Sequence, residues 1–297
     1  MHVLVHLGLN KCASTFIQNA LAGARPALRA ADTWYPDHDE RTCHYGLSKH
    51  YGFGPDDPNI VPRSVAEVVA EARQRRCHRL IVSSEYLSLY RPEAVKNLLH
   101  DLAANTSRFE FLIFSREIFG WIRSLFNQYV KAVEGPGQLD HLNAFVDQVL
   151  RNRAVDAAGR IGLWNGLAPT GSVRHLRLPD RGNLAAALSV FEEFAGLKVE
   201  IDAPAPVNQS IEPAALHRIG QLRRRVPTAD RDVEIMRLMT GGASPYPAPP
   251  DFLEISPDRR ARLIRDVIAP FEALLCERLP SEFAMATTRN LVSEALA

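Results

Sequence analysis

The first twenty residues of the chain constrain its fold more than any other segment. An apolar run from Val3 to Leu7 stops at Gly8 and is followed by the polar stretch Asn10 to Thr15. Apolar residues then recur at helical spacing from Phe16 to Leu21. This pattern predicts a strand, a tight loop and a helix, with the loop opening directly at the N-terminus of the helix.

Such a junction is suited to bind an anion. The first backbone N–H groups of a helix have no partner inside it and point outward with the positive end of the helix dipole. Lys11 adds an ammonium group, and Ser14 and Thr15 add hydroxyl donors. Phosphate is the anion that this combination favours. The loop differs from the ATP-binding sequence, in which Lys directly precedes Ser or Thr, because Lys11 lies three residues before Ser14.

The order Lys, small, small, Ser, Thr resembles the 5′-phosphosulfate-binding loop of PAPS-dependent sulfotransferases. The resemblance implies that PAPS (3′-phosphoadenosine 5′-phosphosulfate) is the cofactor and PAP (3′-phosphoadenosine 5′-phosphate) the product. It also implies six cofactor-binding residues: Asn10, Lys11, Cys12, Ala13, Ser14 and Thr15. Two positions depart from the family pattern, since Cys12 replaces a hydroxyl residue and Ala13 replaces a glycine that is free to adopt positive φ.

A second motif lies a hundred residues further along. The buried-type strand Phe109 to Phe114 ends in Ser115 and Arg116, and a helical pattern follows that contains Ser124. Ligands of open parallel sheets collect beyond the carboxyl ends of strands, where Arg116 is expected to lie. A guanidinium fork and a hydroxyl suit a phosphate monoester. Arg116 and Ser124 resemble the 3′-phosphate-binding element of sulfotransferases, and this second phosphate distinguishes PAPS from ATP.

A weaker resemblance covers residues 173–222. A strand-like segment, an amphipathic helix and then Asn208 and Ser210 follow the order seen in bacterial sulfotransferase-family proteins. Asn208 and Ser210 are therefore further candidates for contact with cofactor or acceptor, although Ser210 suits a helix cap equally well.

Sulfuryl transfer requires a cation beside the departing phosphate and a base that takes the proton of the acceptor. Lys11 is the candidate cation. Glu85, which follows the strand-like run Leu80 to Ser84, and His44, in the segment 42–46, are the two candidate bases. Glycan-modifying sulfotransferases commonly use Glu, and many bacterial relatives have His in a comparable place. Glu85 would equally suit the first turn of a helix, and His44 an exposed loop, so both candidates stay open.

Strand and helix patterns alternate along the chain. Strands are expected near 2–8, 79–84, 109–115 and 172–178, and helices near 14–30, 63–76, 92–104, 117–133, 139–153, 183–195, 212–225 and 257–278. This alternation predicts an α/β, three-layer P-loop NTPase-like fold with a central parallel sheet flanked by helices. We expect a single domain over residues 1–297, with 33–62 and 240–256 as lid or acceptor loops.

Composition excludes several other classes. The 35 basic and 34 acidic residues nearly balance, which argues against a nucleic-acid binder. The four cysteines are scattered without C-x-x-C spacing, which argues against a metal site or a redox motif. No apolar stretch approaches the roughly 20 residues of a membrane span, and the N-terminus lacks the pattern of a secretory signal. A cytoplasmic protein is therefore expected.

The predicted activity is transfer of a sulfuryl group from PAPS to a hydroxyl, or less often an amine, of a carbohydrate, lipid or small-molecule acceptor. Four aromatic residues are candidates to stack on the acceptor, or else belong to the core: Trp34, Tyr35, Tyr90 and Trp164. One alternative is a P-loop kinase that uses ATP and magnesium, which the position of Lys11 disfavours. Another is a non-catalytic nucleotide-binding protein on the same fold, consistent with the departures at Cys12 and Ala13.

Overall fold

The computed structural model describes residues 1–37, 42–54, 57–132, 142–151, 156–178, 185–199, 211–225 and 228–276. Contacts group the chain into two compact units. The α/β unit comprises Met1–Glu117 and Gly159–Val207, and the helical unit comprises Ile118–Ala158 and Asn208–Ala297.

The α/β unit contains a five-stranded sheet in which every pairing is parallel, with the order β2-β3-β1-β4-β5. Its strands are β1 (His2–Gly8), β2 (Thr33–Trp34), β3 (Arg79–Ser83), β4 (Arg108–Ser115) and β5 (Val173–Arg177). In the central register Val5 of β1 lies between Val82 of β3 and Phe111 of β4. Because these strands are parallel, their carboxyl ends share one edge of the sheet.

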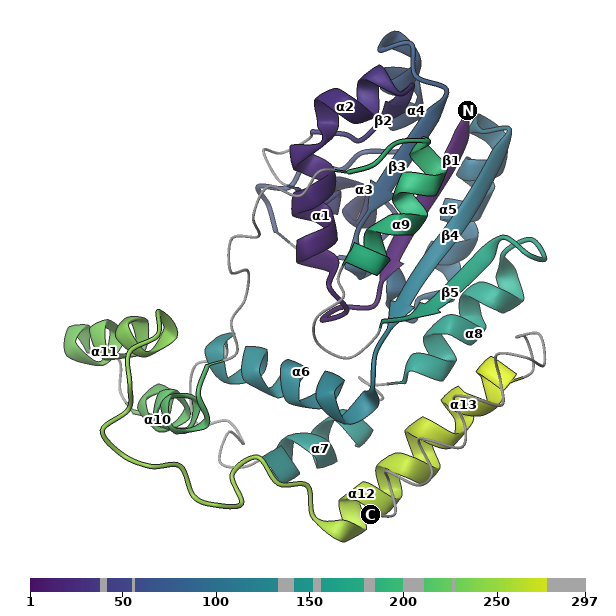
Figure 1. Ribbon diagram of the computed structural model, residues 1–297. Coiled ribbons are helices and arrows are strands. Elements are labelled where there is room, and N and C mark those ends of the chain that lie inside the picture. Colours follow the sequence, from purple (N-terminus) through teal and green to yellow (C-terminus); the bar gives the residue numbers. More distant parts are fainter. Residues whose placement is uncertain are drawn as a thin grey trace. The chain divides into compact units, whose positions relative to one another are not determined.

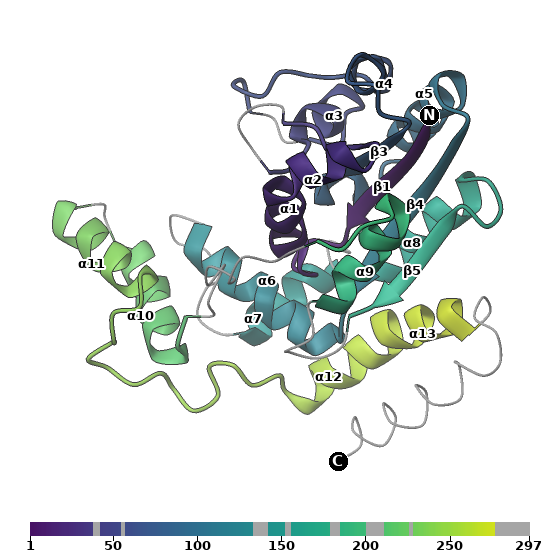
Figure 2. The ribbon, with the colours of Figure 1, turned by 45° about the horizontal axis from the view of Figure 1, so that its top comes forward.

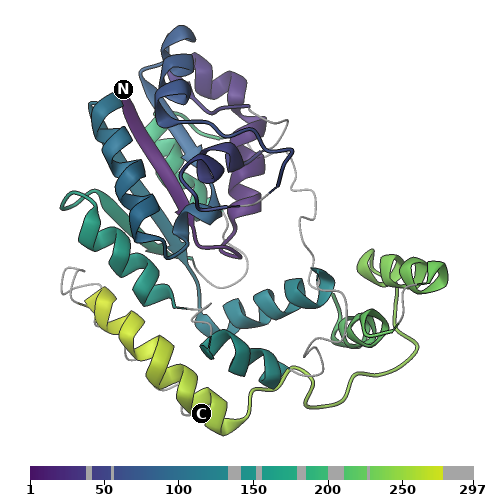
Figure 3. The same cartoon turned by 180° about the vertical axis from the view of Figure 1, so that it is seen from behind.

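Helices cover both faces of this sheet (Figures 1 and 3). One face carries α1 (Ser14–Gly23) and α9 (Ala185–Ala195), and the other carries α4 (Val65–Gln74), α5 (Pro92–Asn105) and α8 (Ala157–Leu167). Side chains alternate between these faces. The ring centroid of His6 in β1 lies 5.7 Å from that of Phe191 in α9, on one face. The ring centroid of Phe111 in β4 lies 4.6 Å from that of Trp164 in α8, on the other face. The predicted α/β class and the central parallel sheet flanked by helices are confirmed.

Short elements were the least predictable. The expected helix over 14–30 is two helices, α1 and α2 (Arg25–Ala30), divided at Ala24. Pro26 lies in the first turn of α2, where its missing N–H costs nothing, whereas inside a continuous helix it would clash with the preceding turn. The segment 33–62 contains β2 and α3 (Tyr45–His50), and residues Glu85–Ser88 form a 3₁₀ turn after β3.

The helical unit is built around aromatic contacts. The ring of Phe126 lies 5.5 Å from Phe145 and 5.6 Å from Phe252, and all three are buried. Its helices are α6 (Ile118–Ala132), α7 (Leu142–Arg151), α10 (Pro213–Arg223), α11 (Ala229–Met239), α12 (Pro257–Leu263) and α13 (Ala269–Cys276), with a π-helical turn, Ile264–Ile268, joining the last two. Figure 2 shows the segment between α11 and α12 running without helix or strand.

Besides α3, which lies in the segment expected to be a loop, two helices in the described part of the chain were not predicted from the sequence. The first is α8, whose glycines at 159, 162 and 166 weaken its helical pattern. The second is α11, which begins after Thr228, whose side chain accepts a hydrogen bond from the backbone N–H of Arg231. A threonine at that position is a recognised start signal that could have identified α11.

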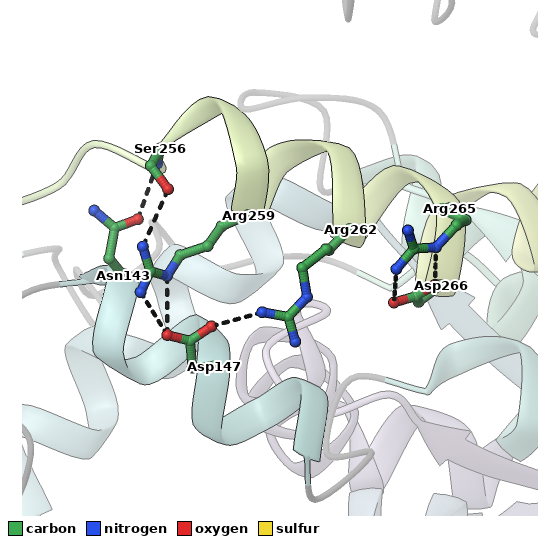
Figure 4. Close-up of polar contacts among 7 residues, drawn as sticks. All are labelled: Asn143, Asp147, Ser256, Arg259, Arg262, Arg265 and Asp266. Atoms are coloured by element: carbon green, nitrogen blue, oxygen red, sulfur yellow. Dashed lines mark hydrogen bonds and ion pairs between the residues drawn. The ribbon is translucent and has the colours of Figure 1, made fainter.

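A carboxylate joins two helices of the helical unit (Figure 4). Asp147 of α7 accepts hydrogen bonds from Nη2 and Nε of Arg259 at 2.6 and 3.0 Å, and from Nη1 of Arg262 at 3.0 Å, both on α12. The Asn143 side chain accepts a further bond from the backbone N–H of Ser256. Hydrogen bonding by Arg259 lowers the pKa of Asp147 below its ordinary value, so this carboxylate stays ionised and keeps both arginines engaged.

Candidate functional site

The loop after β1 begins at Gly8, where a side chain would be crowded against Glu85. Gly8 has φ of +97°, and a Cβ atom placed on it would lie 3.1 Å from both Cα and Cβ of Glu85. The backbone N–H of Leu9 donates to the carbonyl of Phe114 in β4 over 2.8 Å. The start of the loop is therefore held against the carboxyl ends of both neighbouring strands.

The loop continues into the N-terminus of α1 without a side-chain cap. Lys11 and Ala13 have φ of 62° and 61°, so Ala13 adopts the left-handed conformation for which a glycine is usual. Ala13 is also the N-cap residue and has no side-chain acceptor for the first N–H groups of the helix. The first backbone N–H groups of α1 therefore have no side-chain cap, and an anion at this point would accept hydrogen bonds from them.

The two hydroxyl groups of the loop differ in exposure. Ser14 is buried and donates its hydroxyl to the carbonyl of Leu9 over 3.2 Å, which braces the loop. Thr15 is exposed, and Lys11 is half-buried. Side-chain contacts with a ligand are therefore best placed on Lys11 and Thr15.

Cys12 is a buried thiol whose side chain points away from solvent. Burial raises its pKa to about 12, and the positive charge of Arg116 acts in the opposite direction. The thiol therefore stays protonated at neutral pH. Its backbone N–H donates to the carbonyl of Leu9 over 3.3 Å. The backbone of Cys12 is therefore part of the turn, and its side chain is buried.

The sheet brings three of the predicted groups to one edge. The register pairs Gly8 with Ile113 of β4, and Arg116 follows the end of that strand as a half-buried residue. Glu85 follows the end of β3, on the other side of β1. The loop, Arg116 and Glu85 therefore occupy the carboxyl edge of three adjacent strands. Ser124 lies on α6, in the helical unit.

Glu85 has a defined set of hydrogen-bond donors. Its Oε2 accepts a bond from Nε2 of Gln18 over 3.1 Å, and its Oε1 accepts a bond from the hydroxyl of Tyr45 over 3.2 Å. Burial raises the pKa of Tyr45, and the charge of Glu85 acts in the same direction, so the Tyr45 hydroxyl keeps its proton and remains a donor. Neither partner was identified from the sequence. The available signal was Gln18 itself, a polar residue on the apolar face of α1.

His44 is buried and uses both ring nitrogens. Nδ1 accepts the backbone N–H of Ser83 over 2.8 Å, which places the proton on Nε2, and Nε2 donates to the carbonyl of Pro36 over 3.2 Å. The ring also packs edge-on against Tyr35 at 4.7 Å. The lone pair that would take a proton from an acceptor is therefore occupied.

The remaining sequence candidates fall into three groups. Trp34, Tyr35 and Trp164 are buried core residues, whereas Tyr90 is exposed. Asn208 and Ser210 lie outside the described residues. In the part of the chain that the structure describes, no cluster of His, Cys, Asp and Glu is placed to hold a metal. Over the same residues no helix combines the length and the apolar character needed to cross a membrane.

Comparisons with known proteins give a structural similarity but no match in sequence. No family model matches the chain, and no curated protein matches it. Among solved structures it is similar to a sulfotransferase from Alicyclobacillus acidocaldarius, with a TM-score of 0.46 and 12% identity over 81% of this chain and 96% of that one. It is also similar to mouse sulfotransferase SULT7A1 complexed with PAP, with a TM-score of 0.40 and 12% identity over 94% of this chain and 89% of that one. The sulfotransferase domain from the curacin biosynthetic pathway gives a TM-score of 0.37 and 12% identity, covering 88% and 96% of the two chains.

Proposed function

We propose that this protein transfers a sulfuryl group from PAPS to a hydroxyl, or less often an amine, of a carbohydrate, lipid or small-molecule acceptor. The main support is one placement: the loop Asn10 to Thr15, Arg116 and Glu85 follow the carboxyl ends of three adjacent parallel strands. The sequence motifs relate the loop to the phosphosulfate and Arg116 to the 3′-phosphate. Glu85 is one of the two candidate bases.

The donor set fits the charge distribution of PAPS. Lys11, Thr15 and the uncapped N–H groups of α1 suit the phosphosulfate end. Arg116 offers a planar fork for a second phosphate, and its charge reaches the loop closely enough to act on Cys12. In this proposal Asn10, Cys12, Ala13 and Ser14 contribute through the loop backbone and its bracing. Ser124 is retained as a cofactor-binding residue from the sequence motif.

In the proposed mechanism the protein positions groups and moves one proton. PAPS, when bound, supplies the sulfuryl group and leaves as PAP. Glu85 accepts the proton of the acceptor hydroxyl at a carboxylate oxygen as the acceptor oxygen forms its bond to sulfur. Lys11 stabilises the negative charge that grows on the departing phosphate oxygen as the S–O bond breaks. Arg116 binds the 3′-phosphate and so fixes the position of the nucleotide.

Glu85 is the better of the two candidate bases. Its carboxylate is half-buried at the sheet edge, and each oxygen retains acceptor capacity beyond the one bond it receives. His44 would first have to release the N–H of Ser83 before its Nδ1 could accept a proton. Leaving that buried backbone donor without a partner would be costly.

Ligand-induced stabilisation separates this proposal from its alternatives. PAP at a hundred times its dissociation constant should stabilise the protein by about 2.7 kcal/mol and raise its melting temperature by several degrees, whereas ATP with magnesium should do so much less. Turnover is then measured with radiolabelled PAPS and a panel of hydroxyl and amine acceptors. A shift with ATP and magnesium alone would favour the kinase, and PAP binding without transfer to any acceptor would favour a non-catalytic binder. No shift with either nucleotide would refute nucleotide binding at this edge.

A further inference from the structure

The carboxylate of Glu85 is held by side chains from two different helices. Gln18 comes from α1, which follows the loop, and Tyr45 comes from α3, which lies in the segment predicted to contact the acceptor. Each of them donates to a different oxygen of the carboxylate. A carboxylate held at both oxygens cannot rotate freely, so the direction of its remaining lone pairs is set by these two contacts.

Gln18 is fixed in turn by a buried chain of hydrogen bonds. Its Nε2 also donates to Oγ of Ser83 over 3.2 Å, and that oxygen is 2.8 Å from Nδ1 of His6. Gln18 is 3% exposed, and Ser83 and His6 are fully buried. Burial lowers the pKa of His6 to about 3, so His6 is neutral at physiological pH. The hydrogen-bonded series Gln18, Ser83 and His6 therefore carries no charge that competes with Glu85.

Tyr45 is fixed by ring packing. Its ring meets that of Tyr86 edge-on at 5.2 Å, and Tyr86 is the residue directly after Glu85. Edge-to-face contact of this kind favours one ring orientation, and therefore one position of the hydroxyl. Both donors to Glu85 are thus held by contacts that do not depend on a ligand.

We propose that Gln18 and Tyr45 are positioning residues that fix the Glu85 carboxylate in the orientation required to take the acceptor proton. This inference rests on the proposed function. It assigns the two residues no contact with the reacting atoms. Proton transfer needs the acceptor hydroxyl within hydrogen-bond reach of a correctly directed lone pair, and a carboxylate free to turn would meet that geometry less often.

The test is a double-mutant cycle on turnover. Gln18→Met removes the amide at similar length, and Tyr45→Phe removes only the hydroxyl. Each is made in the wild-type protein and in the Glu85→Gln variant. In the wild type each should lower kcat by about tenfold, which is typical of one lost hydrogen bond to a charged group, with the KM for PAPS and the shift induced by PAP unchanged. In the Glu85→Gln background each should change kcat by less than about twofold, because the base they orient is absent.

Tyr86→Phe is the matched control, because it removes a neighbouring phenol hydroxyl for which no bond to the Glu85 carboxylate is found. It should leave kcat unchanged. Equal losses in the presence and absence of the Glu85 carboxylate would show a general structural role and overturn the inference alone, as would full activity of Tyr45→Phe. Absence of sulfuryl transfer by the wild-type protein across the acceptor panel would overturn the proposed function, and this inference with it.

Discussion

Ser83 donates its backbone N–H to Nδ1 of His44 over 2.8 Å, and this bond joins the end of β3 to the start of α3. The backbone N–H of His44 donates to the carbonyl of Ser83 over 2.9 Å, so the two residues are bonded twice. The other ring nitrogen of His44, Nε2, donates a hydrogen bond to the carbonyl of Pro36. The histidine therefore stabilises the chain after β2. Substitution of His44 should lower the stability of the fold rather than act directly on the reaction.

His44→Asn should lower the free energy of unfolding by about 1–3 kcal/mol, because the buried N–H of Ser83 or the carbonyl of Pro36 loses its partner. The melting temperature should fall by several degrees, while the variant that folds still binds PAP. Glu85→Gln should have the opposite profile: an unchanged melting temperature and a kcat that falls by at least about 100-fold. Thermal unfolding and steady-state kinetics on both variants check this. Loss of turnover in His44→Asn at an unchanged melting temperature would restore His44 as the base.

Arg116→Ala should weaken PAP binding by about 10- to 100-fold, which corresponds to the loss of a charge-assisted hydrogen bond, and leave 5′-AMP binding nearly unchanged. The difference arises because only PAP carries the 3′-phosphate. Isothermal titration calorimetry with both nucleotides measures it. Arg108→Ala is the control, because Arg108 begins the same strand at the opposite edge of the sheet and pairs with Glu110. Equal weakening of the two nucleotides by Arg116→Ala would contradict the assignment of Arg116 to the 3′-phosphate.

The sequence predicted the parts of the fold that depend on runs of similar residues. β1, β3, β4 and β5 each contain five or more residues, enough for an apolar or alternating pattern to be visible. β2 has two residues and no such pattern. Chain topology then placed Arg116 and Glu85, because the carboxyl ends of parallel strands share an edge.

The contacts that orient the site were beyond prediction. Gln18 and Glu85 are 67 positions apart, and their bond depends on how α1 and the 3₁₀ turn pack, which no local pattern encodes. The sequence likewise left open whether His44 is exposed, since its burial follows from the packing of α3 against β3. Side-chain pairs of this kind arise only once the layers of the fold are in place.

Gly8→Ala should damage the site through a steric conflict. The added Cβ would lie 3.1 Å from Cα and Cβ of Glu85, closer than real Cβ contacts normally allow, so the loop and Glu85 must move apart. We expect kcat to fall by about tenfold, because Glu85 is the proposed base and even a small displacement of a catalytic group lowers the rate. Gly52→Ala is the control: Gly52 also has positive φ, 79°, but nothing lies within 4 Å of its Cβ position. It should lose about 1–2 kcal/mol of stability and keep its kcat. Full activity in Gly8→Ala would refute the steric argument.

Asp147→Asn should weaken the contact between α7 and α12 in a pH-dependent way. Hydrogen bonding by Arg259 lowers the pKa of Asp147 in the folded state below the value of about 3.9 in the unfolded chain. The stability that this pair contributes, about 1 kcal/mol for a partly exposed pair, is therefore present at pH 5 to 8 and is lost as the pH falls from 3.9 through the folded-state value. Thermal unfolding of the wild type and variant across this range measures the difference in stability, which should be constant above pH 5 and shrink below pH 4.

Asp266→Asn is the control, because Asp266 bonds only to its neighbour Arg265 among the residues drawn in Figure 4 and its substitution should change stability little. A difference between wild type and Asp147→Asn that persists undiminished well below pH 3 would show that the charge of Asp147 is not what joins the helices.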